Sequence, residues 1–234
     1  MRKLNTLLRG ATAVAAALAL LAGGTPPAHA AEREVDVTGF TVQDIVFDGF
    51  GCKNHPVALE GTAREDVDIE YLWMSADISR SRYLVSTVDF LPGETETRTL
   101  ICSWYGLGKY KIGPTTVSGF TADEMFELTD PTSTSFHVRG KARASLGAKR
   151  SGNKVTLTAK ATYYRPESLG YRNHSPKGAE FQVKSSTGWR TIATVDFAQG
   201  KASHSVSRSA KATYRVVLPQ TTSVTAATSP AVRK

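Results

Sequence analysis

Histidines and carboxylates are the residues of this 234-residue chain that could support catalysis. Beyond the first thirty residues the histidines are His55, His137, His174 and His204. A hydrolytic triad places a histidine between a nucleophile and an orienting carboxylate. The chain contains no Gly-x-Ser-x-Gly, no His-Glu-x-x-His and no phosphate-binding glycine loop. We therefore expect a protein that is not an enzyme and that has no catalytic residues and no cofactor.

An enzyme would need a site assembled between the two halves of the chain. Residues 137–234 contain only three acids, which are Glu167, Glu180 and Asp196. A catalytic site in that half would have to borrow acids from the first half and use His137 or His204. His204 alternates in step with Ala202 and Val206, which favours a histidine packed under a sheet edge.

Alternating carboxylates in the first half are candidate ligands of a calcium ion. Asp66, Asp68 and Glu70 lie two residues apart, and carboxylates spaced about 6.6 Å along a flat strand do not converge on one ion. An EF-hand loop also needs a glycine at its sixth position, where this chain has Tyr71. We expect a solvated acidic face and no metal site, with calcium as the alternative if a loop residue such as Asp77 adds ligands.

A long loop between residues 165 and 178 is the candidate ligand-binding site. Aromatic and basic side chains together suit stacking on a sugar or contact with a phosphate. The alternative is a loop that covers the end of a sandwich. The candidate residues are Tyr164, Arg165, Tyr171, Arg172, Asn173, His174 and Lys177.

Cys52 and Cys102 are the two cysteines of the chain. A redox pair normally has the spacing Cys-x-x-Cys, and a zinc site needs four ligands. Neither pattern is present, so we expect a structural disulfide. Closing a loop of about 50 residues would stabilise the fold by roughly 4 kcal/mol in the chain-entropy model.

The first thirty residues have the features of a secretion signal. Arg2, Lys3 and Arg9 precede the apolar run 11–22, which is shorter than the about 20 residues that span a bilayer. Small residues flank His29, so cleavage is expected after Ala30. We predict a secreted, extracellular bacterial protein without a membrane span; an uncleaved membrane anchor is the alternative.

Charge divides the mature chain into two unlike halves. Residues 31–136 contain 8 Lys or Arg and 18 Asp or Glu, whereas residues 137–234 contain 18 Lys or Arg and 3 acids. Such a shift predicts two domains with different surfaces. We expect an acidic domain at 31–130, a polar linker at 131–136 and a basic domain at 137–234.

Hydrophobic alternation with a period of two predicts an all-β fold. Val155, Leu157, Ala159 and Ala161 form one face of a strand in the second half, and Phe181 with Val183 begins another. In the first half we expect three inward-facing rows: Val67, Ile69, Tyr71 and Trp73; Leu100, Cys102 and Trp104; and Tyr110 and Ile112. Short strands separated by turn signals about ten residues apart predict two consecutive immunoglobulin-like antiparallel β-sandwich domains.

The second half resembles a sandwich domain of secreted actinobacterial proteins. The matching segments are Lys154-Val155-Thr156-Leu157, Gly188-Trp189-Arg190-Thr191, Gly200 and Thr213-Tyr214-Arg215-Val216. The resemblance extends over most of residues 138–234, and the first half resembles such proteins more loosely. It implies an immunoglobulin-like fold and secretion, but no activity, because fold does not determine function.

The charge of the second half leads to a functional hypothesis. A net charge of +15 on residues 137–234 creates a positive field of several kT. We expect this basic domain to bind an extracellular polyanion, such as an anionic cell-wall polymer or an acidic polysaccharide. Nucleic acid is disfavoured because no nucleic-acid-binding module is recognisable. Three alternatives stay open: a protein-binding or inhibitor module that acts through exposed loops, an enzyme with an interdomain site, and a charge split that serves contact between the halves.

Overall fold

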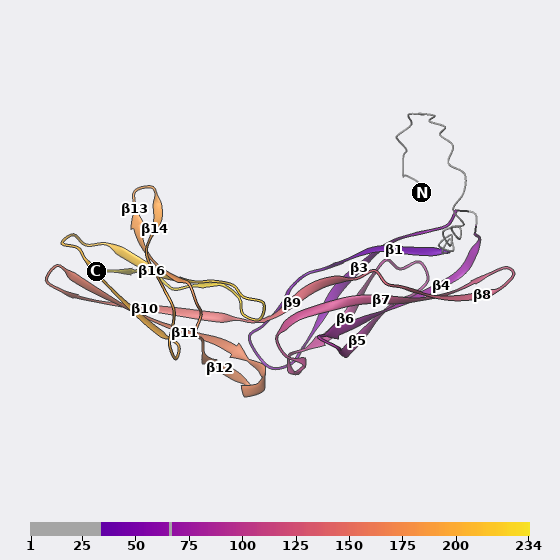
Figure 1. Ribbon diagram of the computed structural model, residues 1–234, viewed down its shortest axis with the longest axis horizontal. Helices are drawn as coiled ribbons and strands as arrows, with labels where there is room; N and C mark the ends of the chain where they lie inside the picture. Colours follow the sequence, from indigo (N-terminus) through magenta and orange to yellow (C-terminus); the bar gives the residue numbers. More distant parts are fainter. Residues whose placement is uncertain (1–33, 66) are drawn as a thin grey trace, which may run out of the picture. The chain divides into compact units, whose positions relative to one another are not determined.

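The computed structural model describes residues 34–65 and 67–234 (Figure 1). The predicted signal peptide, its cleavage after Ala30 and Asp66 lie outside the described residues. In this part of the chain no helix has the length and apolarity needed to cross a membrane.

Two sheets enclose the first hydrophobic core. The three-stranded sheet has the order β1-β3-β6, and the six-stranded sheet has the order β2-β9-β7-β4-β5, with β8 paired to β7. All of these pairs are antiparallel except β2 with β9. The core contains Val37 and Ile101 from the smaller sheet and Ile78, Val117 and Phe136 from the larger one. The strands are β1 (Val35–Val42), β2 (Ile45–Phe47), β3 (Cys52–Ala63), β4 (Ile69–Arg80), β5 (Tyr83–Phe90), β6 (Glu96–Cys102), β7 (Gly108–Thr121), β8 (Met125–Asp130) and β9 (Thr134–Gly140).

A second pair of sheets encloses a separate core. One sheet has the order β10-β11-β12, with β15 also paired to β11; the other has the order β14-β13-β16-β17, with β18 paired to β16. The core between them contains Leu157, Phe181 and Tyr214. The strands are β10 (Ala142–Ser151), β11 (Lys154–Arg165), β12 (Gly170–Asn173), β13 (Ala179–Ser185), β14 (Gly188–Val195), β15 (Lys201–Ser207), β16 (Thr213–Leu218), β17 (Ala227–Thr228) and β18 (Val232–Arg233).

These two sandwiches confirm the predicted fold class. In the second sandwich the sequence pattern identifies the buried faces correctly: Val155, Leu157 and Phe181 are fully buried. In the first sandwich the predicted row of Tyr110 and Ile112 is buried as well. Cys52 and Cys102 form the predicted disulfide, and they lie directly opposite each other on β3 and β6.

Two of the rows predicted to face inward are wrong in part: Ile69 packs against the first core and Cys102 is buried, whereas most of the other residues of these rows are exposed. The register between β4 and β7 shifts between Ile69 and Tyr71, and such a bulge reverses which side chains face the core. Tyr71 and Trp73 are therefore about half exposed, and Met74 and Ile78 occupy the core instead. Leu100 and Trp104 are also exposed, because Ile101 carries the inward face of β6 and the chain then turns into the 3-10 helix η1 (Ser103–Tyr105).

Strand β9 connects the two sandwiches. It begins at Thr134, inside the segment expected to be a linker, and lies between β2 and β7 in the six-stranded sheet. β10 starts two residues after β9 ends, so the chain passes from one sheet to the next at Lys141 (Figure 1).

Gly140, the last residue of β9, sits against β11. A Cβ atom on Gly140 would lie 2.1 Å from the carbonyl oxygen of Tyr164. Only glycine allows this approach.

Candidate functional site

The predicted loop residues separate into buried and exposed groups. Tyr164 is 2% exposed and belongs to the core of the first sandwich. Its ring is in edge-to-face contact with that of Tyr171, at 6.0 Å between centroids. His174 is also buried, its ring lies 5.2 Å from that of Tyr163, and burial lowers the pKa of this histidine. These side chains pack the end of β11 and offer little surface to a ligand.

The exposed members of the predicted loop site are Arg165, Arg172, Asn173 and Lys177. Arg165 forms an ion pair of 3.4 Å with Glu167. Arg165 precedes the 3-10 helix η2 (Pro166–Ser168), and Glu167 lies within it. Arg172 donates hydrogen bonds to the backbone oxygens of Tyr171 and Ser168, each at 3.0 Å. Arg165 and Arg172 are therefore already engaged by groups of the same loop. The predicted residues do not line a common cleft.

Cations and hydroxyls gather instead on the outer face of the sheet formed by β10, β11, β12 and β15. Residues paired across antiparallel strands point to the same face, and the inner partners of these strands, such as Leu157 and Ala159, are fully buried. We call the outer set the hydroxyl–cation face. Its five rows are Arg143, Thr162 and Asn173; Ser145, Lys160 and Lys201; Gly147, Thr158 and Ser203; Lys149, Thr156 and Ser205; and Ser151, Lys154 and Ser207.

Carboxylates are missing from these fifteen positions, whereas five of them carry a positive charge: Arg143, Lys149, Lys154, Lys160 and Lys201. All five side chains are exposed. Between residues 34 and 234, position 66 excepted, the ion pairs engage Asp44, Asp48 and Glu167, and each of their cationic partners lies outside the face. Among the residues that the structure describes, no carboxylate therefore forms an ion pair with these five cations.

Hydroxyl groups order the centre of the face. Thr156 and Ser205 share a hydrogen bond of 3.2 Å, and Ser203 donates to Thr158 at 3.4 Å. Arg143 lies over the ring of Tyr171, 3.6 Å from its centroid. This cation–π contact fixes the guanidinium at the β12 end of the face.

Lys160 and Lys201 are directly opposite each other on β11 and β15. The Cβ atoms of such a pair lie about 4.5–5.5 Å apart, and like charges in this arrangement are destabilising. An anion placed between the two ammonium groups would accept hydrogen bonds from both. The arrangement is therefore suited to an anionic group of a ligand.

A hollow at the end of the same sandwich is also basic. It has a volume of about 520 Å³ and is lined by Arg150, Lys211, Arg233 and Lys234. Arg150 is held in place because its guanidinium donates to the backbone oxygens of Ala210 and Lys234, both at 3.1 Å. The sequence pattern singled out neither this hollow nor the five cations of the face. The available signal was the lack of acids at the polar positions of these strands.

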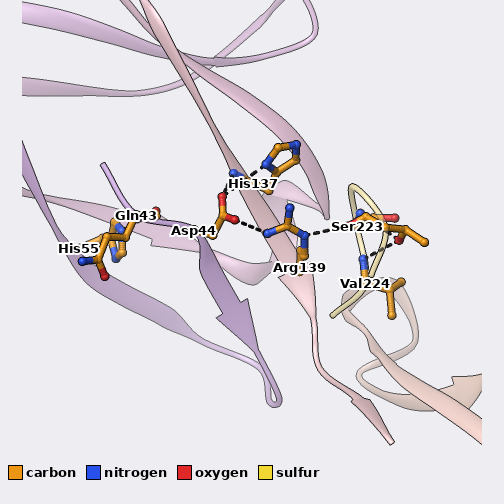
Figure 2. Close-up of polar contacts among 8 residues, drawn as sticks. Gln43, Asp44, His55, His137, Arg139, Ser223 and Val224 are labelled. Atoms are coloured by element: carbon orange, nitrogen blue, oxygen red, sulfur yellow. Dashed lines mark hydrogen bonds and ion pairs between the residues drawn. The ribbon is translucent and has the colours of Figure 1, made fainter. Parts of the chain in front are cut away.

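A carboxylate and a histidine meet where β9 leaves the first sandwich (Figure 2). Asp44 forms an ion pair with Arg139 and accepts a hydrogen bond of 2.6 Å from the backbone N–H of His137, whose ring nitrogen Nδ1 lies 3.4 Å from the carboxylate. Burial raises the pKa of Asp44, but the hydrogen bonds from Arg139 and His137 outweigh this effect and hold the pKa below its usual range.

Arg139 links this carboxylate to the second sandwich. Its Nε donates to the backbone oxygen of Thr221 at 2.7 Å. The backbone N–H of Gly140 donates to the backbone oxygen of Ser223 at 2.9 Å. Arg139 itself is only 6% exposed. These contacts join the two sandwiches. The carboxylate of Asp44 that lies beside His137 is already paired with Arg139.

His204, the other histidine weighed for catalysis, is half-buried on the inner face of β15 opposite Leu157. Its ring lies 6.0 Å from that of Phe181 in the second core. This position is the one expected for a histidine packed under a sheet. Within the described residues we find no cluster of three or more His, Cys, Asp or Glu side chains that could hold a metal ion.

Comparisons with known proteins identify no family. No family model matches the chain, and no curated protein matches it. Solved structures with some similarity include the D0-D1 domain of intimin, with 15% identity over 84% of this chain and 97% of that chain and a TM-score of 0.27. They also include β-glucuronidase 3 of Bacteroides uniformis (10% identity, 85% of this chain, 24% of that chain, TM-score 0.26) and a β-glucuronidase of Parabacteroides merdae (11%, 86%, 25%, TM-score 0.27).

The chain spans about a quarter of the length of the two glucuronidases. TM-scores this low give no basis for transferring a function from any of these proteins. The function has to be inferred from the residues of the site itself.

Proposed function

We propose that this protein is a secreted, non-catalytic binding protein whose basic second sandwich binds an extracellular polyanion through the hydroxyl–cation face. The opposed pair of Lys160 and Lys201 carries the proposal, because it places two like charges side by side and no carboxylate of residues 34–65 or 67–234 forms an ion pair with either. A protein retains such a locally unfavourable arrangement where a ligand supplies the missing charge.

The shape of the face favours a polymer over a small anion. Arg143 and Ser151 mark its two ends on β10, and eight residue steps of about 3.4 Å give a length of about 27 Å. Cations occur in four of the five rows. A chain with regularly repeated anionic groups can contact several rows at once, whereas a single phosphate can contact only one or two.

The composition of the face favours a cell-wall polymer or acidic polysaccharide over a nucleic acid. Single-stranded nucleic acids are bound largely by stacking of bases on exposed aromatic rings. The face offers hydroxyls, which hydrogen-bond to sugars and phosphates, and Tyr171 beside it is covered by Arg143. Membership in a group of secreted actinobacterial sandwich proteins is part of the same proposal, and the disulfide is consistent with an extracellular location.

The second candidate is an enzyme that uses the pair of Asp44 and His137. The contact places an acid beside one of the two histidines named for such a site, although both residues belong to the first sandwich, because β9 carries His137 in its six-stranded sheet. Hydrolysis would also require a nucleophile within hydrogen-bond reach of the histidine. If His137→Ala abolishes a hydrolytic activity of the purified protein without changing its stability, this candidate replaces the first.

The experiment that tests polyanion binding uses the mature chain and two probes: purified bacterial cell wall in a pull-down assay and poly(glycerol phosphate) in calorimetry. We expect binding in about 50 mM salt and release in about 500 mM salt, because the polymer regains its counterions. Wall stripped of its anionic polymers is the control and should not retain the protein. Retention on stripped wall, or binding that does not respond to salt, would contradict the proposal.

The protein-binding alternative predicts a different result. A module that acts through exposed loops would bind neither probe, and its binding to a protein partner would survive substitution of Lys160 and Lys201. The same two lysines thus separate the polyanion proposal from this alternative.

A further inference from the structure

A cluster of exposed apolar side chains lies on the outer face of the six-stranded sheet in the first sandwich. β4, β7 and β8 are neighbours there (Figure 1). The first row of paired residues is Tyr71, Phe120 and Met125, and the next is Trp73, Ser118 and Glu127. Tyr71 is 49% exposed, Trp73 45%, Phe120 47% and Met125 68%. We call these four residues the aromatic platform.

The platform is not part of a core. The inward neighbours on the same strands, Met74 and Val117, supply the packing of the sandwich. Apolar side chains scattered singly on a surface are normal, but a contiguous set on one face of a soluble protein marks a binding surface. The rings of Tyr71 and Phe120 are in edge-to-face contact, with centroids 6.3 Å apart, so the two side chains hold each other in place before any ligand arrives.

The size of the platform argues against a stable protein interface. An aromatic side chain can bury about 150–250 Å², so three half-exposed rings offer together about 200–400 Å². A stable protein interface buries about 800 Å² on each partner. The platform is too small for such an interface and is of the size of a few sugar rings.

The polar groups beside the platform favour sugar hydroxyls. Glu127 and Ser118 lie in the row of Trp73, and the following row contains Asp89, Ser75, Thr116 and Thr129. These ten residues include two carboxylates and no cation. Carboxylates accept hydrogen bonds from hydroxyl groups and repel an anionic polymer, so this face and the hydroxyl–cation face select ligands of opposite character.

We propose that the aromatic platform binds a neutral polysaccharide. The apolar C–H groups of a pyranose ring would stack on the aromatic faces, which carry a negative partial charge, and the ring hydroxyls would reach Glu127 and Asp89. This inference goes beyond polyanion binding, because it assigns a second ligand class to the other sandwich. A protein with both sites would connect a neutral polymer to an anionic one.

The test uses the mature chain with insoluble cellulose, chitin, xylan and mannan as probes in pull-down assays. We expect retention on at least one of these polysaccharides, and equal retention in about 50 mM and about 500 mM salt, because no counterions are released. Trp73→Ala and Tyr71→Ala should each weaken binding by about 2- to 12-fold, the loss of one aromatic stacking contact. Circular dichroism and the melting temperature verify that both variants fold, as expected for exposed side chains.

Two controls make the result decisive. Tyr83→Ala removes an aromatic side chain that is 66% exposed and outside the platform, and it should leave binding unchanged. Substitution of Lys160 and Lys201 should also leave it unchanged, so the two proposals can fail separately. The inference is overturned if none of the four polysaccharides retains the protein, if Tyr83→Ala weakens binding as much as Trp73→Ala, or if Trp73→Ala instead dissociates a dimer of this chain.

Discussion

Replacing Lys160 and Lys201 together with glutamine should stabilise the unliganded protein and weaken polyanion binding. Glutamine keeps the length and hydrogen-bonding capacity of the side chain but removes the charge. Two like charges directly opposite on adjacent strands cost about 0.2–1 kcal/mol. Relieving this repulsion should raise the melting temperature in low salt by up to about 4 °C for a chain of this size.

The effect on binding has the opposite sign. Each cation that contacts a flexible polyanion contributes about 0.7 to the slope of log K against log salt. Five cations of the face predict a slope of about −3.5, and the double variant, with three, a slope of about −2.1. Affinity should therefore fall about 3000-fold for the natural protein and about 130-fold for the variant when salt increases tenfold.

The assay combines calorimetric titration with poly(glycerol phosphate) at several salt concentrations and thermal unfolding without ligand. The matched control is Lys111→Gln with Lys184→Gln, two exposed lysines outside the face and outside the loop, which change the net charge by the same amount. A third variant, Arg165→Ala with Arg172→Ala and Lys177→Ala, tests the loop. Equal slopes for the face variant and the matched control would refute a built site, and a larger loss in the loop variant would move the site to residues 165–178.

Three further predictions concern the framework. Cys52→Ala should lower the free energy of unfolding of the protein by up to about 4 kcal/mol, measured by denaturant unfolding against the natural protein. Gly140→Ala should lower the unfolding midpoint and disturb both cores, because its Cβ would overlap the carbonyl oxygen of Tyr164; a midpoint equal to that of the natural protein would contradict this packing. The Tyr110 hydroxyl donates a hydrogen bond of 2.7 Å to the backbone oxygen of Gly106, and burial raises the pKa of Tyr110 to about 12. The hydroxyl therefore loses its proton at a lower pH in the unfolded chain than in the folded protein. Stability should therefore be full below about pH 10 and fall between pH 10 and 12, and Tyr110→Phe should flatten that part of the profile.

The second sandwich was the more predictable half, because β10, β15 and β16 alternate between inner and outer residues over their whole length. A period of two over Val155, Leu157 and Ala159 is sufficient to place β11 and its buried face. In the first sandwich the pattern fails at Tyr71 and Trp73, since a bulge near Glu70 reverses the faces. Nothing in the local sequence distinguishes an aromatic residue that fills a core from one that faces solvent.

The hydroxyl–cation face could not be predicted from the sequence for a different reason. The count of charges already indicated a basic half, but the five cations of the face come from three strands separated by up to 58 residues of sequence, between Arg143 and Lys201. Their alignment depends on the register of β10 and β15 against β11. The register follows from side-chain packing in the finished core and is not visible in any one strand.

Strand β9 determines how this molecule can be divided and how it would respond to tension. A fragment that begins at residue 137 would cut β9 and leave β2 with half of its partner, while Tyr164 would lose the core in which it is buried. The two sandwiches should therefore unfold as one cooperative unit. If each sandwich bound a different polymer, a force between the two polymers would be transmitted by the hydrogen-bonded backbone of β9 and by the Asp44–Arg139 ion pair. It would not be transmitted by a flexible linker.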